Sequence, residues 1–73
     1  MFDMNQCKPG DKLVSCHGSI FTYIKKNENG YPYPHIVEYS DGGYGSRTDD
    51  GFVYSTKRLP EDHNIVGFYK EED

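Results

Sequence analysis

Five side chains of the types that bind zinc occur in this chain of 73 residues: Cys7, Cys16, His17, His35 and His63. A structural zinc site usually begins with two cysteines about two to four residues apart, because that spacing places two ligands of the tetrahedron together. Here eight residues separate the two cysteines. The spacing argues against a metal site, and we expect no cofactor.

The same two cysteines raise the question of a disulfide, which would close a short loop over the first turn of the chain. Nothing marks the protein as secreted, since the N-terminal MFDMNQCKPGD has neither a basic segment nor an apolar run. No segment approaches the roughly 18 apolar residues of a membrane helix. We therefore expect thiols in a cytoplasmic protein, with the bridge as the alternative.

Nucleophilic catalysis would need a nucleophile and a base that converge. Cys16 or Ser15 stands beside His17, and Asp62 stands beside His63. Neighbours in a strand point to opposite faces, so Cys16 and His17 converge only if the intervening turn redirects them. Sequence adjacency alone therefore gives little support to a catalytic pair.

Two pairs of carboxylates and one glycine-rich stretch also have structural explanations. Asp49-Asp50 and Glu61-Asp62 lie in turn sequence, where aspartate commonly bonds its own backbone. The stretch GGYGSRTDDG has neither the lysine nor the strand-to-helix context of a phosphate-binding loop. We expect that the protein is not an enzyme.

The composition favours a single all-β domain. The chain has no alanine and two leucines, whereas it contains 7 tyrosines, 4 phenylalanines and 8 glycines. The net charge of -4 arises from 8 basic and 12 acidic residues, and removal of the acidic residues at 71–73 leaves 8 minus 9, or -1. We expect a leader at 1–7, one domain at 8–70 and a solvated acidic tail at 71–73.

Short runs of β-branched and aromatic residues, separated by turn residues, predict five or six strands. We place them at 12–16, 19–25, 35–39, 43–47, 52–55 and 65–69. A small sheet hides its edges best by closing, so the expected architecture is a small barrel of antiparallel strands. In 19–25 we favour an inward row of Ile20, Thr22 and Ile24, although the opposite row of aromatic residues remains an alternative.

The stretch GYPYPHIVEY at 30–39 combines an unusual beginning with a clear strand. Tyr31 and Tyr33 each precede a proline, which favours extended backbone and excludes hydrogen-bond donation by the prolines. We therefore expect residues 31–34 to lie outside the sheet or at its edge, with both tyrosines exposed.

The opening KPGDKLV, the turn at Gly18 and the turn at Asp41-Gly42 resemble the layout of SH3-like barrels. The segments YPYPHIVEY, SRTDDGFVYS and DHNIVGFY are similar to small proteins encoded by bacteriophages and prophages, although Asn64 stands where that pattern has aspartate. The resemblance spans residues 8–69 and implies a bacterial host. It implies no shared activity.

Two functions are compatible with such a domain. We favour an adaptor or inhibitor that binds a host or phage protein, as a monomer or weak homodimer, through Tyr31, Tyr33, Tyr44 and Arg47. The alternative is a platform for single-stranded nucleic acid, although an isoelectric point near 5.2 argues against it. Its contacts would be Tyr23, Lys25, Lys26, Tyr54, Lys57 and Arg58.

Overall fold

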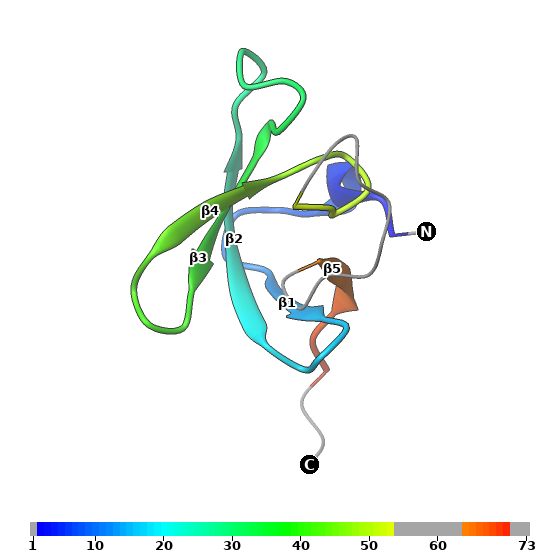
Figure 1. Ribbon diagram of the computed structural model, residues 1–73, viewed down its shortest axis with the longest axis vertical. Coiled ribbons are helices and arrows are strands. Elements are labelled where there is room, and N and C mark those ends of the chain that lie inside the picture. Colours follow the sequence, from blue (N-terminus) through cyan, green and yellow to red (C-terminus); the bar gives the residue numbers. More distant parts are fainter. Residues whose placement is uncertain (1, 54–63, 71–73) are drawn as a thin grey trace.

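The computed structural model describes residues 2–53 and 64–70 of the chain. It contains a short 3₁₀ helix and five strands (Figure 1): η1 (Met4–Gln6), β1 (Lys12–Ser15), β2 (Ile20–Lys26), β3 (His35–Tyr39), β4 (Tyr44–Arg47) and β5 (Ile65–Phe68). The expected acidic tail at 71–73 lies outside the described residues. Within the described part of the chain, no helix has the length and hydropathy needed to cross a bilayer.

All five strands belong to one antiparallel sheet in the order β4-β3-β2-β1-β5. This confirms the predicted all-β class. The central strand β2 is the longest, with seven residues, and the register shifts between Tyr23 and Lys25, where it pairs with β3. A bulge of this kind bends a strand and increases its twist. The sheet is accordingly curled, so that β3 and β4 turn away from β1 and β5 (Figure 1).

The predicted strand at 52–55 is wrong for the two residues that the structure describes. The carbonyl of Phe52 accepts a hydrogen bond from the amide of Thr48 at 3.0 Å, and the amide of Val53 donates to the side-chain oxygen of Asn64 at 2.8 Å. These backbone groups therefore bond to a turn and a side chain, and neither residue joins the sheet. Tyr54 and Ser55 lie outside the described residues.

Strand pairing does not close the sheet into the expected barrel. In the described residues, β4 and β5 are the two edges of the sheet. The loop that follows β4 nevertheless reaches β5, because the amide of Ile65 donates to the carbonyl of Gly51 at 2.8 Å. The amide of Met4 also donates to the carbonyl of Asp49 in this loop, again at 2.8 Å. Loop contacts thus bring the two ends of the curled sheet together.

The core lies on the concave side of the sheet and draws on η1 and four strands. It consists of Met4, Leu13, Phe21, Tyr23, Val37 and Ile65. The favoured inward face of β2 is therefore wrong: the aromatic row is buried, while Ile20, Thr22 and Ile24 are half-buried on the other face. Short strands with small neighbours leave a space that large rings fill better than β-branched side chains.

Part of the expected leader packs as core. Met4 is fully buried, and the carboxylate of Asp3 caps its 3₁₀ turn by accepting a hydrogen bond from the amide of Asn5 at 2.9 Å. Aspartate at this position satisfies an amide that the turn leaves without a partner. The side chain of Met4 in this turn packs into the core against the sheet.

Gly51 is required at the closing contact of the sheet. Its φ is +86°, and a Cβ at this position would lie 2.5 Å from the carbonyl oxygen of Ile65. We expect Gly51→Ala to lower the free energy of unfolding by about 3 kcal/mol or more, measured by urea denaturation. Gly18→Ala is the matched control, because Gly18 has a φ of +84° but open space around it. Equal losses in the two variants would contradict the role of the close approach.

Candidate functional site

The side chains considered for metal binding and catalysis are dispersed over the fold. His35 is fully buried in β3, Cys7 is half-buried beside the core, and Cys16 and His17 lie exposed in the turn after β1. His63 lies outside the described residues. Among the described residues, no group of three His, Cys, Asp or Glu side chains is arranged to hold a metal ion. Both cysteines are thiols in this structure.

A buried chain of three polar side chains is the most ordered arrangement in the protein. The hydroxyl of Tyr23 in β2 lies 2.8 Å from Nδ1 of His35 in β3. On the other side of the ring, Nε2 of His35 lies 2.7 Å from Oδ1 of Asp49, in the loop after β4. Tyr23 and His35 are buried, whereas the side chain of Asp49 is 41% exposed.

The chemistry of the three groups sets the direction of these hydrogen bonds. A carboxylate only accepts hydrogen bonds, so Nε2 of His35 carries a hydrogen and donates a hydrogen bond to Asp49. In a neutral imidazole Nδ1 is then an acceptor, and the hydroxyl of Tyr23 donates to it. If the ring gains a proton, Nδ1 donates to the hydroxyl oxygen instead. Both charge states of His35 thus keep two hydrogen bonds.

The tyrosine and the imidazole of this chain are buried, whereas its Asp49 end is partly exposed. A general base must reach its substrate, and His35 has no exposed surface. No local pattern indicates this arrangement, because His35 lies 12 positions after Tyr23 and Asp49 lies 14 positions after His35. Asp49 was interpreted as turn sequence, and its loop position agrees with that interpretation.

Two side chains in this region, Cys7 and Tyr23, have raised pKa values. Burial, then the negative charges of Asp11 and Asp3, raise the pKa of the Cys7 thiol from 9.0 to about 11. Burial, then the charges of Cys7 and Asp49, raise the pKa of Tyr23 from 10.0 to about 12. Reactive cysteines have lowered pKa values, so Cys7 has the character of an inert thiol.

Arg47 was predicted as an exposed contact residue, and this is wrong because its side chain is 1% exposed. Its guanidinium carbon lies 5.4 Å from the ring centroid of Phe21 and 5.5 Å from that of Tyr39. Nη1 also donates to the hydroxyl of Tyr39 at 3.3 Å and to the carbonyl of Ser46 at 2.8 Å. Stacking on rings suits a guanidinium, which is weakly hydrated and planar.

The three tyrosines predicted as contacts do not form one surface. Tyr31 is exposed in a turn closed by a 2.8 Å hydrogen bond from the amide of Tyr33 to the carbonyl of Gly30, while Tyr33 is half-buried. The chain therefore turns at 30–33 instead of running extended, as the sequence had predicted, and the Tyr31–Pro32 peptide bond is cis. Tyr44 is exposed at the start of β4, beyond the opposite end of β3.

The residues predicted as nucleic-acid contacts differ in their exposure to solvent. Tyr23 is 3% exposed with its hydroxyl bonded to His35, so its ring is closed to stacking with a base. Lys25 and Lys26 are exposed, and Nζ of Lys26 donates to the side chain of Asn5 at 2.8 Å and lies 5.7 Å from the ring centroid of Tyr31. Three further residues lie outside the described residues: Tyr54, Lys57 and Arg58.

Exposed apolar side chains concentrate at the C-terminal edge strand. Five large hydrophobic residues are exposed in the described part of the chain, and three of them are at β5: Val66 at 54%, Phe68 at 38% and Tyr69 at 37%. The ring of Phe2 packs edge-to-face on Phe68, with 5.1 Å between centroids. The sequence predicted this strand but gave no indication of which of its side chains face solvent.

Comparison with known proteins finds no matching family model, no matching curated protein and no matching solved structure. The resemblances to SH3-like barrels and to bacteriophage proteins therefore stay predictions. The function has to be inferred from the fold and from the side chains that it buries or exposes.

The hydroxyl of Tyr23 is expected to stabilise the fold. In Tyr23→Phe, Nδ1 of His35 would remain buried without a donor, so we expect the free energy of unfolding to fall by about 1–3 kcal/mol. The exposed Tyr44 provides the matched control, and Tyr44→Phe should change stability by less than about 0.5 kcal/mol. Urea denaturation measures both, and similar small losses would show that the buried chain contributes nothing.

Stability should decrease at alkaline pH. The unfolded Cys7 thiol ionises near 9.0 and the folded thiol near about 11, so between these values the folded state retains a proton that the unfolded state has lost. This contribution is fully present below about pH 9 and is lost as the pH rises. We expect the urea midpoint to fall from about pH 8 to about pH 10.5, and to fall less steeply in Cys7→Ser. Identical profiles for the two proteins would contradict the raised pKa.

Proposed function

We propose that this chain is a small, non-catalytic module that binds another protein through the outer side of β5. The observation that carries the proposal is the concentration of exposed apolar side chains on this one edge strand, at Val66 and Phe68, and directly after it, at Tyr69. Edge strands of soluble proteins are usually protected by lysine, proline or a covering element. Residues 65–69, IVGFY, include no charged residue and no proline.

The side chains of β5 are also the types that anchor protein interfaces. Aromatic residues are enriched in the buried centres of interfaces, where rigid rings supply contact area at a small entropic cost. Phe2 supports Phe68 from behind through their edge-to-face contact. A ring held in this way is ordered before a partner arrives, which reduces the cost of binding.

We also propose that the curled sheet belongs to the SH3-like class of small barrels. Strand β5 pairs with β1, and β1 to β4 follow one another as a meander, so further pairing between β4 and β5 would complete a ring. The bulge in β2 and the contact of Gly51 with Ile65 both support this curvature. Small barrels of this kind are frequent carriers of binding surfaces.

The similarity to bacteriophage and prophage proteins supports a more specific role. We propose that the chain acts in a bacterial host as an adaptor or inhibitor of a host or phage protein. Tyr31 and Tyr44 are exposed enough to contribute secondary contacts, whereas Tyr33 is half-buried and Arg47 is buried.

The proposal predicts that a charge on β5 abolishes binding to the partner. We expect immobilised protein to retain a specific protein from a bacterial lysate, and Val66→Asp to lose it, because the carboxylate would have to be desolvated in the interface. Asn29→Asp adds the same charge in an exposed loop and should behave like the unchanged protein. Circular dichroism would verify the folding of each variant.

Other outcomes of this experiment would contradict the proposal. Equal retention by Val66→Asp would remove β5 as the surface, and loss in Tyr44→Asp alone would place the contact on β4. Retention of no protein, together with saturable binding of labelled single-stranded DNA, would favour the nucleic-acid alternative over protein binding.

A further inference from the structure

The hydrogen bonds of β1 show which backbone groups of β5 face the sheet. The amide of Ser15 donates to the carbonyl of Ser19 on the β2 side at 2.8 Å, whereas the carbonyl of Lys12 accepts from the amide of Tyr69 on the β5 side at 2.9 Å. Successive residues of a strand between two antiparallel neighbours bond to opposite sides. The odd-numbered residues of β1 therefore bond to β2, and its even-numbered residues bond to β5.

Phe68 is consequently left with its amide and its carbonyl on the outer edge of the sheet. It pairs with the odd-numbered Leu13, so the two residues exchange no hydrogen bonds, and the backbone groups of Phe68 point away from β1. No residue that the structure describes bonds to either group. Phe68 thus offers one donor and one acceptor to a chain from outside.

A bulge in β5 brings Phe68 to this position. The register with β1 skips Val66, which is an extra residue in the strand. Ile65 also faces outward, because its amide donates to the carbonyl of Gly51 at 2.8 Å. Without the extra residue, Ile65 and Gly67 would face the outer edge, whereas with it Ile65 and Phe68 do. The loop after β4 thus occupies the first outward position of β5, and the second is open.

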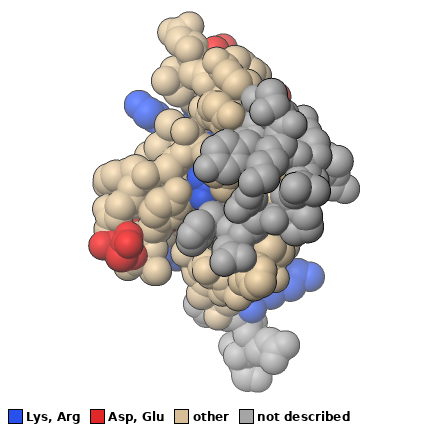
Figure 2. All heavy atoms as spheres, viewed as in Figure 1, with Lys and Arg blue, Asp and Glu red and all other residues tan. Residues whose placement is uncertain are grey.

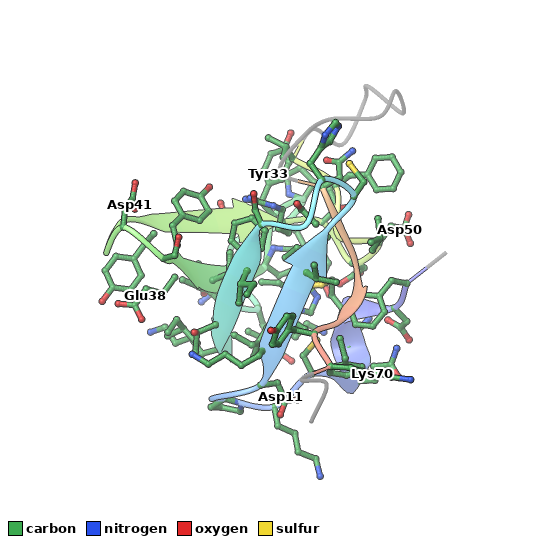
Figure 3. The ribbon with its side chains drawn as sticks, turned by 90° about the horizontal axis from the view of Figure 1, so that it is seen from below. Asp11, Tyr33, Glu38, Asp41, Asp50 and Lys70 are labelled. Atoms are coloured by element: carbon green, nitrogen blue, oxygen red, sulfur yellow. The ribbon has the colours of Figure 1, made fainter. Side chains whose placement is uncertain are left out.

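The edge around Phe68 is accessible from outside. Figure 3 shows Asp50 of the loop after β4 near one end of β5 and Lys70 beyond the other end, with the outer side of the strand between them. A Cβ on Gly67 would meet no atom within 4 Å, so there is room beside the backbone. In the space-filling view, the acidic atoms of described residues lie in the left and upper parts of the visible face, whereas β5 ends in the lower part (Figures 1 and 2). The described carboxylates on that face therefore do not shield this edge.

We propose that the protein partner contributes an extended segment that adds to β5 as a further strand, with its backbone bonded to the amide and the carbonyl of Phe68. This assignment rests on the proposed function, because the segment belongs to the bound protein. An extended chain presents unused N–H and C=O groups to a sheet edge, whereas a helix uses its own groups internally. A helix on β5 would therefore bury the two groups of Phe68 without partners.

The neighbouring side chains define the character of this segment. Val66 and Phe68 are exposed and apolar, so the residues of the segment beside them should be apolar as well, because a charge there would lose its hydration. Residues with β-branched or aromatic side chains satisfy this condition and favour the extended backbone. The partner segment is thus an uncharged strand with alternating side chains.

A second copy of this chain is the competing occupant, and the contact of Gly51 disfavours it. Two β5 strands paired antiparallel about Phe68 would place Ile65 of each copy opposite the residue after Lys70 of the other. Gly51 already lies on that side of Ile65. A twofold pair meets this obstacle at both ends, whereas a partner segment meets it at one end and can continue past Lys70.

Hydrogen exchange of the free protein tests the geometry of the edge. The amide of Tyr69 is bonded to Lys12, whereas that of Phe68 points outward, so we expect Phe68 to exchange roughly tenfold or more faster than Tyr69. NMR measures both amides in one experiment. Equal protection of the two amides would overturn the assignment before any ligand is added.

The binding test uses a random library of blocked peptides of about six residues, a usual strand length. We expect the selected sequences to alternate β-branched or aromatic residues, to shift the amides of residues 66–70 saturably, and to protect the amide of Phe68 from exchange. Selection of no sequence, or shifts centred on other residues, would contradict strand addition.

Replacement of one backbone amide by an ester isolates the hydrogen bond itself. An ester at Phe68 retains the ring and removes the outward donor, so the strongest selected peptide should bind roughly threefold or more weakly. The matched control is an ester at Ser46, whose pairing with Ile36 directs its amide outward on the β4 edge. In both variants the carbonyl that becomes an ester belongs to a glycine bonded into the sheet, Gly67 or Gly45, so their losses of stability should be similar. Equal peptide binding by the two variants would overturn the assignment.

These results are separable from the lysate test of β5. If the peptides fail, or ignore the ester at Phe68, while capture remains sensitive to Val66→Asp, strand addition is wrong and the protein-binding function stands. If capture fails, that function fails on its own evidence, whatever the peptides do. If sedimentation shows a dimer of the free protein that the ester at Phe68 abolishes, the occupant is a second copy and the assignment to a partner is wrong.

Discussion

The two hydrogen bonds of His35 are the interaction that holds the loop after β4 against the curled sheet. They join β2, β3 and the loop after β4 through contacts of 2.8 and 2.7 Å. The same loop accepts the amides of Met4 and Ile65, so whatever fixes Asp49 also fixes η1 and β5. A buried polar group without its partner costs about 1–3 kcal/mol of folding free energy. The three hydrogen-bonded side chains therefore stabilise the fold only when all three are present. These two side-chain hydrogen bonds thus act together with the bulge in β2 and the contact between Gly51 and Ile65 to hold the curled sheet.

A domain of 73 residues has little apolar surface to bury, and this one fills its interior partly with polar side chains. Arg47 is the clearest example, because its charge lies between two rings and its donors reach the Tyr39 hydroxyl and a carbonyl. Gly45 permits this arrangement, since a Cβ there would collide with the Tyr39 ring. Tyr23 and Tyr39 thus serve both as packed rings and as hydrogen-bond partners of buried side chains.

The sequence predicted the elements well where local chemistry decides them. Turn residues bound the strand at 35–39, and the structure has β3 at the same residues. The inward face of β2, the burial of Arg47 and the partners of His35 were not predictable, because each depends on residues from other strands. The same reason explains Met4, whose burial requires a loop about 45 residues later in the chain. The exposure of the apolar residues of β5 was not predictable either, because it depends on the position of this strand at the edge of the sheet.

The pairing of β5 with β1 has a consequence for synthesis on the ribosome. Ser15 of β1 pairs with Ile65 of β5, so 50 residues separate the partners in the order of translation. At roughly 5–20 residues per second, β1 waits about 3–10 s for its outer neighbour. During that interval the meander of β1 to β4 has an unpaired edge at β1. The last strand to emerge is therefore the one that ends this exposure.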